Sequence, residues 1–60
     1  MTFGELKVGQ QFFFEKFFGG AVCVKVEQVC GFDDYGSYRL ANHTLDDTRL
    51  STNAQIVRPA

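Results

Sequence analysis

Residues 11–29 read QFFFEKFFGGAVCVKVEQV, and this stretch decides the predicted fold. Its second half alternates with a period of two, which is typical of a β-strand with one buried face. Three valines share one face of that strand, and the other face carries Cys23, Lys25 and Glu27. The two glycines at 19–20 permit a tight reversal between residues 11–18 and 21–29. The stretch therefore predicts an antiparallel hairpin of two strands.

Three further segments read as short strands, at residues 36–42, 45–51 and 55–59. Pro59 ends the last one, where its missing N–H costs least. No run of ten residues has the apolar period of 3.6 that an amphipathic helix needs. Five short strands in a single domain, residues 1–60, predict an all-β fold closed into a small barrel that hides its own edges. We expect at most one 3₁₀ turn, at 51–54, before the last strand.

The order of these segments resembles that of a known group of proteins. FGELKVGQQF, CVKVEQV, YRLAN and the closing IVRP are similar to the layout of short uncharacterised phage and prophage proteins. Those proteins resemble SH3-like barrels, so the resemblance implies a five-stranded SH3-like barrel and a phage or prophage origin. It carries no catalytic residue over to this chain. The chain departs from the pattern at EKFFGG, residues 15–20, which adds aromatic bulk near the first hairpin.

Cys23 and Cys30 flank VKVEQV within one predicted strand. Extended chain separates their Cα atoms by about 23 Å, whereas a disulfide needs them within about 7 Å. We therefore expect two reduced thiols that pack as small buried hydrophobes, and a reactive or intermolecular cysteine is the alternative. The sequence shows no signal peptide and no long apolar span, so we expect a cytoplasmic protein that does not bind membranes.

Residues that catalyse reactions or bind metals are sparse in this sequence. The aspartate pairs at 33–34 and 46–47 lie in turn-like surroundings, where aspartate is favoured for its local backbone hydrogen bonds. His43 stands alone, and a structural zinc site needs about four ligands at recognisable spacing. The sequence contains no nucleophile motif and no phosphate-binding glycine loop. We predict a non-enzymatic protein with no metal or cofactor; an enzyme would need a pocket built from His43, Asp46 and Asp47.

Five of the seven phenylalanines fall within residues 12–18. Only one face of a barrel strand points inward, so alternation places Phe12 and Phe14 in the core and leaves Phe13 and Phe17 outside. A β-bulge within this strand would exchange Phe17 with Phe18, but it would not bury all five rings. Each ring carries roughly 150–250 Å², and an exposed pair approaches the size of an interaction patch. The predicted core partners of Phe12 and Phe14 are Val22, Val24, Val26, Leu40 and Ile56.

An exposed aromatic patch of this size is expected to be covered by other residues of the chain or by a partner. Neighbouring loops would cover it in a monomer, and a second copy or a foreign partner would cover it in a complex. We predict a binding module that forms a homo-oligomer, or binds a host protein, by burying these rings against its partner. Glu15 and Lys16 would set the orientation at the rim. The predicted contact surface consists of Phe13, Glu15, Lys16, Phe17 and Phe18.

The alternative hypothesis is an oligomeric binder of a nucleotide, such as a host immune signal, or of nucleic acid. Small β-barrels stack bases on exposed aromatic rings, but they also need cations for the phosphates. The formal net charge is −1 and the six basic residues are scattered, so nucleic acid is the less favoured ligand. A local anion site would form if cations converged across adjacent strands. The predicted residues of that site are Lys25, Tyr35, Tyr38 and Arg39.

Overall fold

The computed structural model describes residues 1–16, 18–30, 34–42 and 47–60, without the side chain of Phe18. In these residues five strands form one antiparallel sheet in the order β4-β3-β2-β1-β5. The prediction of an all-β fold with five strands is confirmed. The strands are β1 (Gln11–Phe14), β2 (Cys23–Val29), β3 (Tyr35–Leu40), β4 (Arg49–Thr52) and β5 (Val57–Pro59).

Two short 3₁₀ elements lie in the first third of the described chain. The first, η1 (Phe3–Glu5), begins at a Thr-x-x-Glu capping box. The Glu5 carboxylate accepts hydrogen bonds from the Thr2 N–H at 2.9 Å and from the Thr2 hydroxyl at 3.0 Å. The second, η2 (Phe18–Gly20), is irregular, because Gly19 and Gly20 have positive φ angles of 56° and 86°. Before β5, where we expected a 3₁₀ turn, the Gln55 N–H donates to the Thr52 carbonyl at 3.4 Å and closes a turn.

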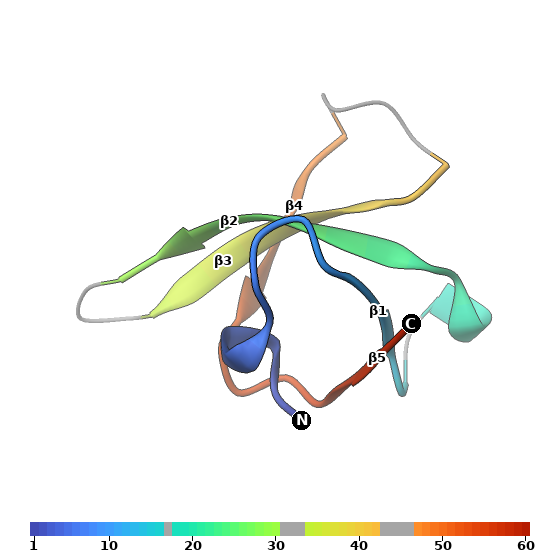
Figure 1. Cartoon of the computed structure of the whole chain (residues 1–60), viewed down its shortest axis with the longest axis horizontal. Coiled ribbons are helices and arrows are strands. Elements are labelled where there is room, and N and C mark those ends of the chain that lie inside the picture. Colours follow the sequence, from blue (N-terminus) through green and yellow to red (C-terminus); the bar gives the residue numbers. More distant parts are fainter. Residues whose placement is uncertain (17, 31–33, 43–46) are drawn as a thin grey trace.

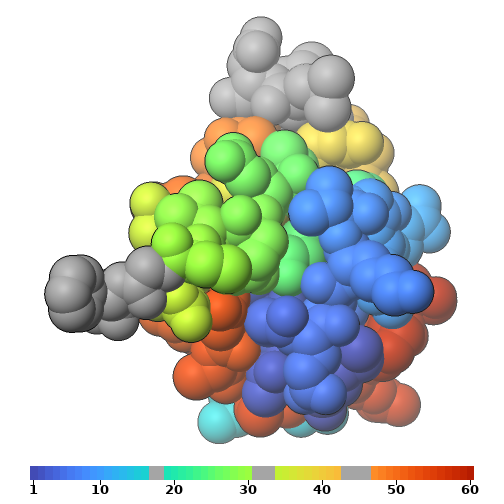
Figure 2. All heavy atoms as spheres, turned by 60° about the vertical axis from the view of Figure 1, so that its left-hand side comes forward, coloured from blue at the N-terminus to red at the C-terminus, as the bar shows by residue number. Residues whose placement is uncertain are grey.

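The sheet curls so that its two edge strands approach the N-terminal segment. In Figure 1 the long β2–β3 hairpin runs across the upper part of the sheet, and β1 and β5 lie below its right-hand end. The N-terminal segment bonds to the link between β4 and β5: the Phe3 N–H donates to the Gln55 carbonyl at 2.8 Å, and the Gly4 N–H donates to the Asn53 carbonyl at 3.1 Å. Figure 2 shows these blue residues packed beside the orange-red residues that precede β5. The N-terminal segment therefore bridges the two ends of the sheet.

Four aromatic rings form the centre of the core. Phe12 and Phe14 are buried, as predicted, and their ring centroids lie 5.1 Å apart in an edge-to-face arrangement. Tyr38 approaches Phe14 edge to face at 4.8 Å, and Phe3 stacks against Phe14 at 6.4 Å. Such ring pairs stabilise a core beyond the area they bury. The other buried apolar residues are Leu6, Cys23 and Val57, with Leu40 packed against them as predicted.

The predicted inward face of β2 is wrong. Phe12 lies directly opposite Cys23, and directly opposed residues of antiparallel strands share a face. Because Phe12 points inward, Cys23 and Lys25 also point inward, and the valines at 22, 24 and 26 are half-buried. Ile56, another predicted core residue, is 48% exposed. A register shift between Lys25 and Glu27 marks a β-bulge in β2. The bulge that we considered was instead in the preceding segment, residues 11–18.

The first strand is also shorter than predicted, because it ends at Phe14 instead of Phe18. Its pairing with β5 ends where Val57, the first residue of β5, lies opposite Phe14. Beyond that point Glu15 and Lys16 are exposed. The link between β1 and β2 is therefore longer than the tight reversal we expected at the two glycines.

Candidate protein-binding surfaces

Strand β1 places Phe13 on the side of the sheet away from the core, where its ring is half-buried. Phe13 lies directly opposite Arg58 of β5, so the two side chains share this outer face. A hollow of about 370 Å³ opens beside them. We call it the Phe13 hollow, and it is lined by Phe13, Phe14, Glu15, Gly20, Arg58 and Pro59.

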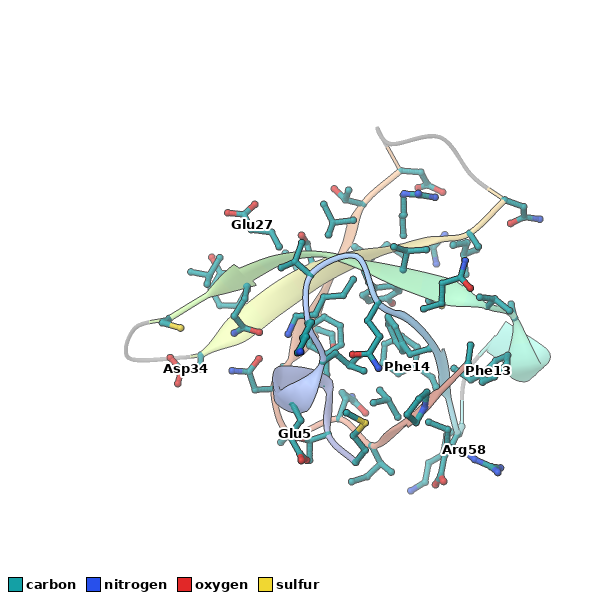
Figure 3. All side chains as sticks on the ribbon, viewed as in Figure 1. Glu5, Phe13, Phe14, Glu27, Asp34 and Arg58 are labelled. Carbon is teal, nitrogen blue, oxygen red and sulfur yellow. The ribbon has the colours of Figure 1, made fainter. Side chains whose placement is uncertain are left out.

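Two opposite charges flank the Phe13 hollow. Glu15 lies two residues after Phe13, just beyond the end of β1, and both Glu15 and Arg58 are exposed. Figure 3 shows Arg58 near Phe13 and directed away from the molecule, whereas Phe14 lies nearer the core. Within the described part of the chain, the carboxylate and the guanidinium form no ion pair with each other. The hollow therefore presents an aromatic ring with a cation and an anion that are both available to a partner.

A second apolar surface lies at the opposite edge of the sheet, on β4. Leu50 is 72% exposed, the largest value among the exposed large hydrophobic residues of the described chain. Its strand neighbour Ser51 is buried, so Leu50 and Thr52 occupy the outer face. Tyr35 of β3 lies opposite Thr52 and joins them around a shallow hollow of about 320 Å³. We call Leu50, Thr52 and Tyr35 the Leu50 edge.

Lys25, a predicted ligand-binding residue, belongs to the core. Its side chain is 1% exposed, and its Nζ donates hydrogen bonds to the Phe3 carbonyl at 3.0 Å and the Leu6 carbonyl at 2.9 Å. The same Nζ lies 4.7 Å from the centroid of the Phe3 ring, a cation–π distance. Burial lowers the pKa of Lys25 below its ordinary 10.5. The ammonium therefore joins β2 to η1 and is not accessible to a surface ligand.

The four residues predicted to bind a nucleotide do not form one surface. Tyr38 is buried beside Lys25, its direct neighbour across β2 and β3. Tyr35 and Arg39 lie on the outer face of β3, where the Arg39 guanidinium donates to the Leu40 carbonyl at 3.4 Å and the Ala41 carbonyl at 3.3 Å. The predicted anion site is therefore corrected: alternation along β2 and β3 turns two of its members inward.

Both cysteines are free thiols, and their environments differ. Cys23 is buried in the core, as predicted, and burial raises its thiol pKa above the ordinary 9.0. Such a shift keeps the thiol protonated and unreactive near neutral pH. Cys30 is exposed at the end of β2, so the expectation of a buried small hydrophobe is wrong for this residue.

Several predicted residues lie outside the part of the chain that the structure describes. Phe17 and the side chain of Phe18 are among them, and so are His43 and Asp46 of the enzyme alternative. Of the predicted contact surface, Phe13 and Glu15 line the Phe13 hollow, and Lys16 is exposed beyond β1.

Sequence reasoning missed Arg58, Pro59 and Leu50 as surface residues. Arg58 and Pro59 reach the Phe13 hollow only because β5 pairs with β1, and no local pattern identifies that pairing. Leu50 lies in a weakly alternating segment, where one leucine beside polar residues reads equally well as core or surface. Its position on β4, an edge strand of the sheet, decides its exposure.

Comparison of the chain with protein-family models, with curated proteins and with solved structures finds no match. The resemblance to phage proteins and to SH3-like barrels therefore stays a prediction. None of the helical elements in the described ranges is long and apolar enough to cross a membrane.

Proposed function

We propose that this chain is a non-enzymatic binding module that associates with a second copy of itself through the Phe13 hollow. The observation that carries the proposal is the half-buried ring of Phe13, placed between a carboxylate and a guanidinium that form no ion pair with each other. Aromatic rings at the centre of a surface and charges at its rim are the usual composition of a protein interface. A host protein is the other candidate partner.

The charges of the Phe13 hollow favour a second copy as the partner. A two-fold axis beside Phe13 would place Glu15 of each chain near the partner's Arg58, because the same patch serves on both sides of such an interface. Both ion pairs would form at once, and the two Phe13 rings would meet between them. A surface that carries both charges is self-complementary, whereas a surface of one sign would repel its own copy.

The ring and the charges contribute differently to this association. Exposed ion pairs are worth about 0–1 kcal/mol each, so Glu15 and Arg58 mainly set the orientation. Buried aromatic residues at an interface centre are worth 2 kcal/mol or more on truncation. We therefore assign most of the affinity to Phe13 and most of the specificity to the charges.

The nucleotide alternative has less support than protein binding. Lys25 and Tyr38 lie in the core, so an anionic ligand would meet only Tyr35 and Arg39 of the four residues predicted for it. At the Phe13 hollow, the Glu15 carboxylate would repel a phosphate that approached Arg58. The mixed charges of this hollow suit a protein surface better than a polyanion.

The first test is the mass of the chain in solution, measured by light scattering after size exclusion over a range of concentrations. We expect a dimer for the wild type and a dissociation constant about 30-fold higher for Phe13→Ser, which corresponds to about 2 kcal/mol. Val8→Ser is the matched control, because Val8 is 61% exposed outside the hollow. A wild type that stays monomeric at every concentration contradicts the proposal.

Charge exchange tests the orientation of the two copies. Glu15→Arg and Arg58→Glu should each weaken the dimer about tenfold, because each places like charges opposite one another across the axis. The double variant should restore the wild-type mass at low ionic strength, since both pairs re-form with their signs exchanged. High salt should reduce these differences by screening the exposed charges. A double variant as monomeric as the single ones would rule out the Glu15–Arg58 pairs and point to a foreign partner.

We place this function in the cytoplasm of a cell that carries a phage or prophage, as the resemblance to phage proteins implies. An exposed cysteine in free thiol form, Cys30, suits a reducing compartment.

A further inference from the structure

We infer that the Leu50 edge is a second self-association surface, at which β4 pairs with β4 of another copy across a two-fold axis centred on Leu50. This pairing would extend the five-stranded sheet into a sheet of ten strands. It uses the opposite edge of the sheet from the Phe13 hollow and does not depend on that site.

The main-chain groups of Leu50 point away from the sheet. The Asn53 N–H donates to the Asp34 carbonyl at 3.4 Å, which continues the β3–β4 register beyond Tyr35 and Thr52. In an antiparallel pair, hydrogen-bonded positions alternate with positions whose N–H and C=O groups face outward. Ser51 is therefore bonded to β3, and the N–H and C=O groups of Leu50 and Thr52 face away from it.

Of Leu50 and Thr52, Leu50 is the residue whose outward main-chain groups are available to bond another strand. The Thr52 carbonyl already accepts hydrogen bonds from the Gln55 N–H at 3.4 Å and from the Ser51 hydroxyl at 3.0 Å. Leu50 lies within the edge strand β4 and exposes 72% of its surface. An edge strand that presents an apolar side chain and outward main-chain groups is a template for another strand. Leu50 therefore supplies both the main-chain hydrogen-bonding groups and the apolar side chain for such a pairing.

A two-fold axis at Leu50 satisfies both kinds of contact together. Two antiparallel residues that face each other in a hydrogen-bonded pair exchange both N–H···O=C bonds, so Leu50 and the partner's Leu50 would satisfy one another. Both leucine side chains would then lie on the same outer face, where Tyr35 extends the apolar strip. Arg49 would face the partner's Ser51, so no like charges would be directly opposed.

The same geometry selects one register for the pairing with a second copy. Shifting the pairing by one residue would place the exposed Leu50 against the buried face of the partner strand. Centring it on Thr52 would use a carbonyl that is already bonded within the chain. The Leu50-centred register avoids both problems, and its two-fold symmetry closes the assembly at two copies per edge.

Disulfide trapping tests this register directly. Facing residues of a hydrogen-bonded antiparallel pair have Cα atoms about 5.5 Å apart, within the range a disulfide requires. We would oxidise Leu50→Cys with copper phenanthroline in air, in chains that also carry Cys30→Ser and Arg58→Glu. The first added change removes the exposed thiol, and the second weakens association at the Phe13 hollow. The matched control is Thr52→Cys, on the same face of β4.

The control position would lie about 13 Å along the strand from its own copy, at about 3.3 Å per residue. We expect Leu50→Cys to form disulfide-linked dimers at least tenfold faster than Thr52→Cys, as measured on non-reducing gels. Equal rates, or a faster Thr52→Cys reaction, would overturn the proposal.

A measurement on a chain with intact Leu50 guards against misfolding of the cysteine variants. In the Arg58→Glu chain, hydrogen exchange of the Leu50 amide should slow at least threefold as the protein concentration rises, because this N–H becomes bonded only in the pair. The Ser51 amide, bonded to β3, should not change. A Leu50 amide that exchanges at one rate at all concentrations would also overturn the inference.

Discussion

Lys25 is a buried charged residue whose hydrogen bonds hold the N-terminal segment against β2. Its ammonium donates to two main-chain carbonyls of the N-terminal segment and lies over the Phe3 ring. Hydrogen bonds from a charged donor are about twice as strong as neutral ones, and they offset part of the cost of burying the charge. One side chain therefore connects β2 with a segment about twenty residues earlier in the sequence.

We predict that Lys25→Met lowers the free energy of unfolding at pH 7 by about 1–3 kcal/mol, because it leaves the Leu6 carbonyl buried without its donor. Lys16→Met is the matched control: Lys16 is exposed, so its loss should change stability by less than about 0.5 kcal/mol. Urea denaturation followed by circular dichroism measures both. Equal losses for the two variants would show that the buried hydrogen bonds contribute little.

The same variant has a defined pH dependence. Burial lowers the pKa of Lys25 in the folded chain below 10.5, so between the two values the unfolded chain binds more protons than the folded one. The stability contributed by Lys25 therefore rises with pH across that window. We expect the deficit of Lys25→Met relative to wild type to widen as pH approaches 10.5 and then to stay constant. A deficit that narrows in this range would contradict the assignment of a buried amine.

At the scale of elements, η1 packs closely against β3 because Gly36 has no side chain. A Cβ atom at Gly36 would lie 2.5 Å from the Glu27 carbonyl oxygen and 2.7 Å from Cε1 of Phe3. Both distances are too short for real contacts, and one of the neighbours is main chain. This glycine therefore lets the 3₁₀ turn bring Phe3 into the core.

We predict that Gly36→Ala destabilises the fold by about 1–3 kcal/mol, because overpacking forces the main chain of β2 or the Phe3 ring to move. Gly4→Ala should cost less. Its added Cβ would meet the Cβ and Cγ atoms of the half-buried Asn53 at 2.8 and 3.0 Å, which are longer distances than those at Gly36. Thermal unfolding by calorimetry compares the two. A larger loss for Gly4→Ala would mean that the η1–β3 contact is not the tighter one.

At the scale of the whole molecule, ionisable groups in the core change the stability of the fold in opposite directions as the pH rises. Burial raises the pKa of Tyr38 above 10.0 and that of Cys23 above 9.0, while a smaller opposing effect of Arg49 lowers both. The folded chain holds these protons longer than the unfolded chain, so stability falls as pH rises above about 9 and falls further above about 10. Lys25 acts in the opposite direction up to 10.5.

We predict that Tyr38→Phe loses less stability than the wild type between pH 9 and pH 11. The variant lacks the phenol that the unfolded chain ionises, while Cys23 and Lys25 contribute equally to both proteins. Urea midpoints at pH 9, 10 and 11 measure the effect. Parallel curves for the two proteins would show that the Tyr38 phenol ionises at the same pH in both states.

The two proposed surfaces also combine at this scale. The Phe13 hollow lies on the β1–β5 side of the sheet and the Leu50 edge lies on β4, at the other end of the strand order. Each would join two copies through its own two-fold axis. Two different two-fold axes on one chain build either a closed tetramer or an open fibre, according to the angle between them. Arg58→Glu weakens the contact at the Phe13 hollow, whereas oxidised Leu50→Cys cross-links the contact at the Leu50 edge, so the two variants report on the two surfaces separately.

The amino-acid sequence by itself determined the strands and their number. The period of two, the glycines between segments and the lack of a 3.6 period are local properties, and they predicted five strands and the burial of Phe12 and Phe14 correctly. The Thr2–Glu5 capping box is a local signal as well, and it marks the start of η1. Of the candidate site, the outward direction of Phe13 and the exposure of Glu15 also followed from alternation. Alternation placed Lys16 on the face of Phe12 and Phe14, and Lys16 is exposed because β1 ends at Phe14.

Only the tertiary structure decided which face of β2 is buried and which residues meet at the surface. Alternation defines two faces but does not say which one points inward; the register of Phe12 against Cys23 chose the face with Lys25. A buried lysine is costly unless acceptors surround it, and those carbonyls come from η1, far away in the sequence. The pairing of β5 with β1 likewise placed Arg58 beside Phe13. Contacts between distant segments depend on register and packing, which no local pattern contains.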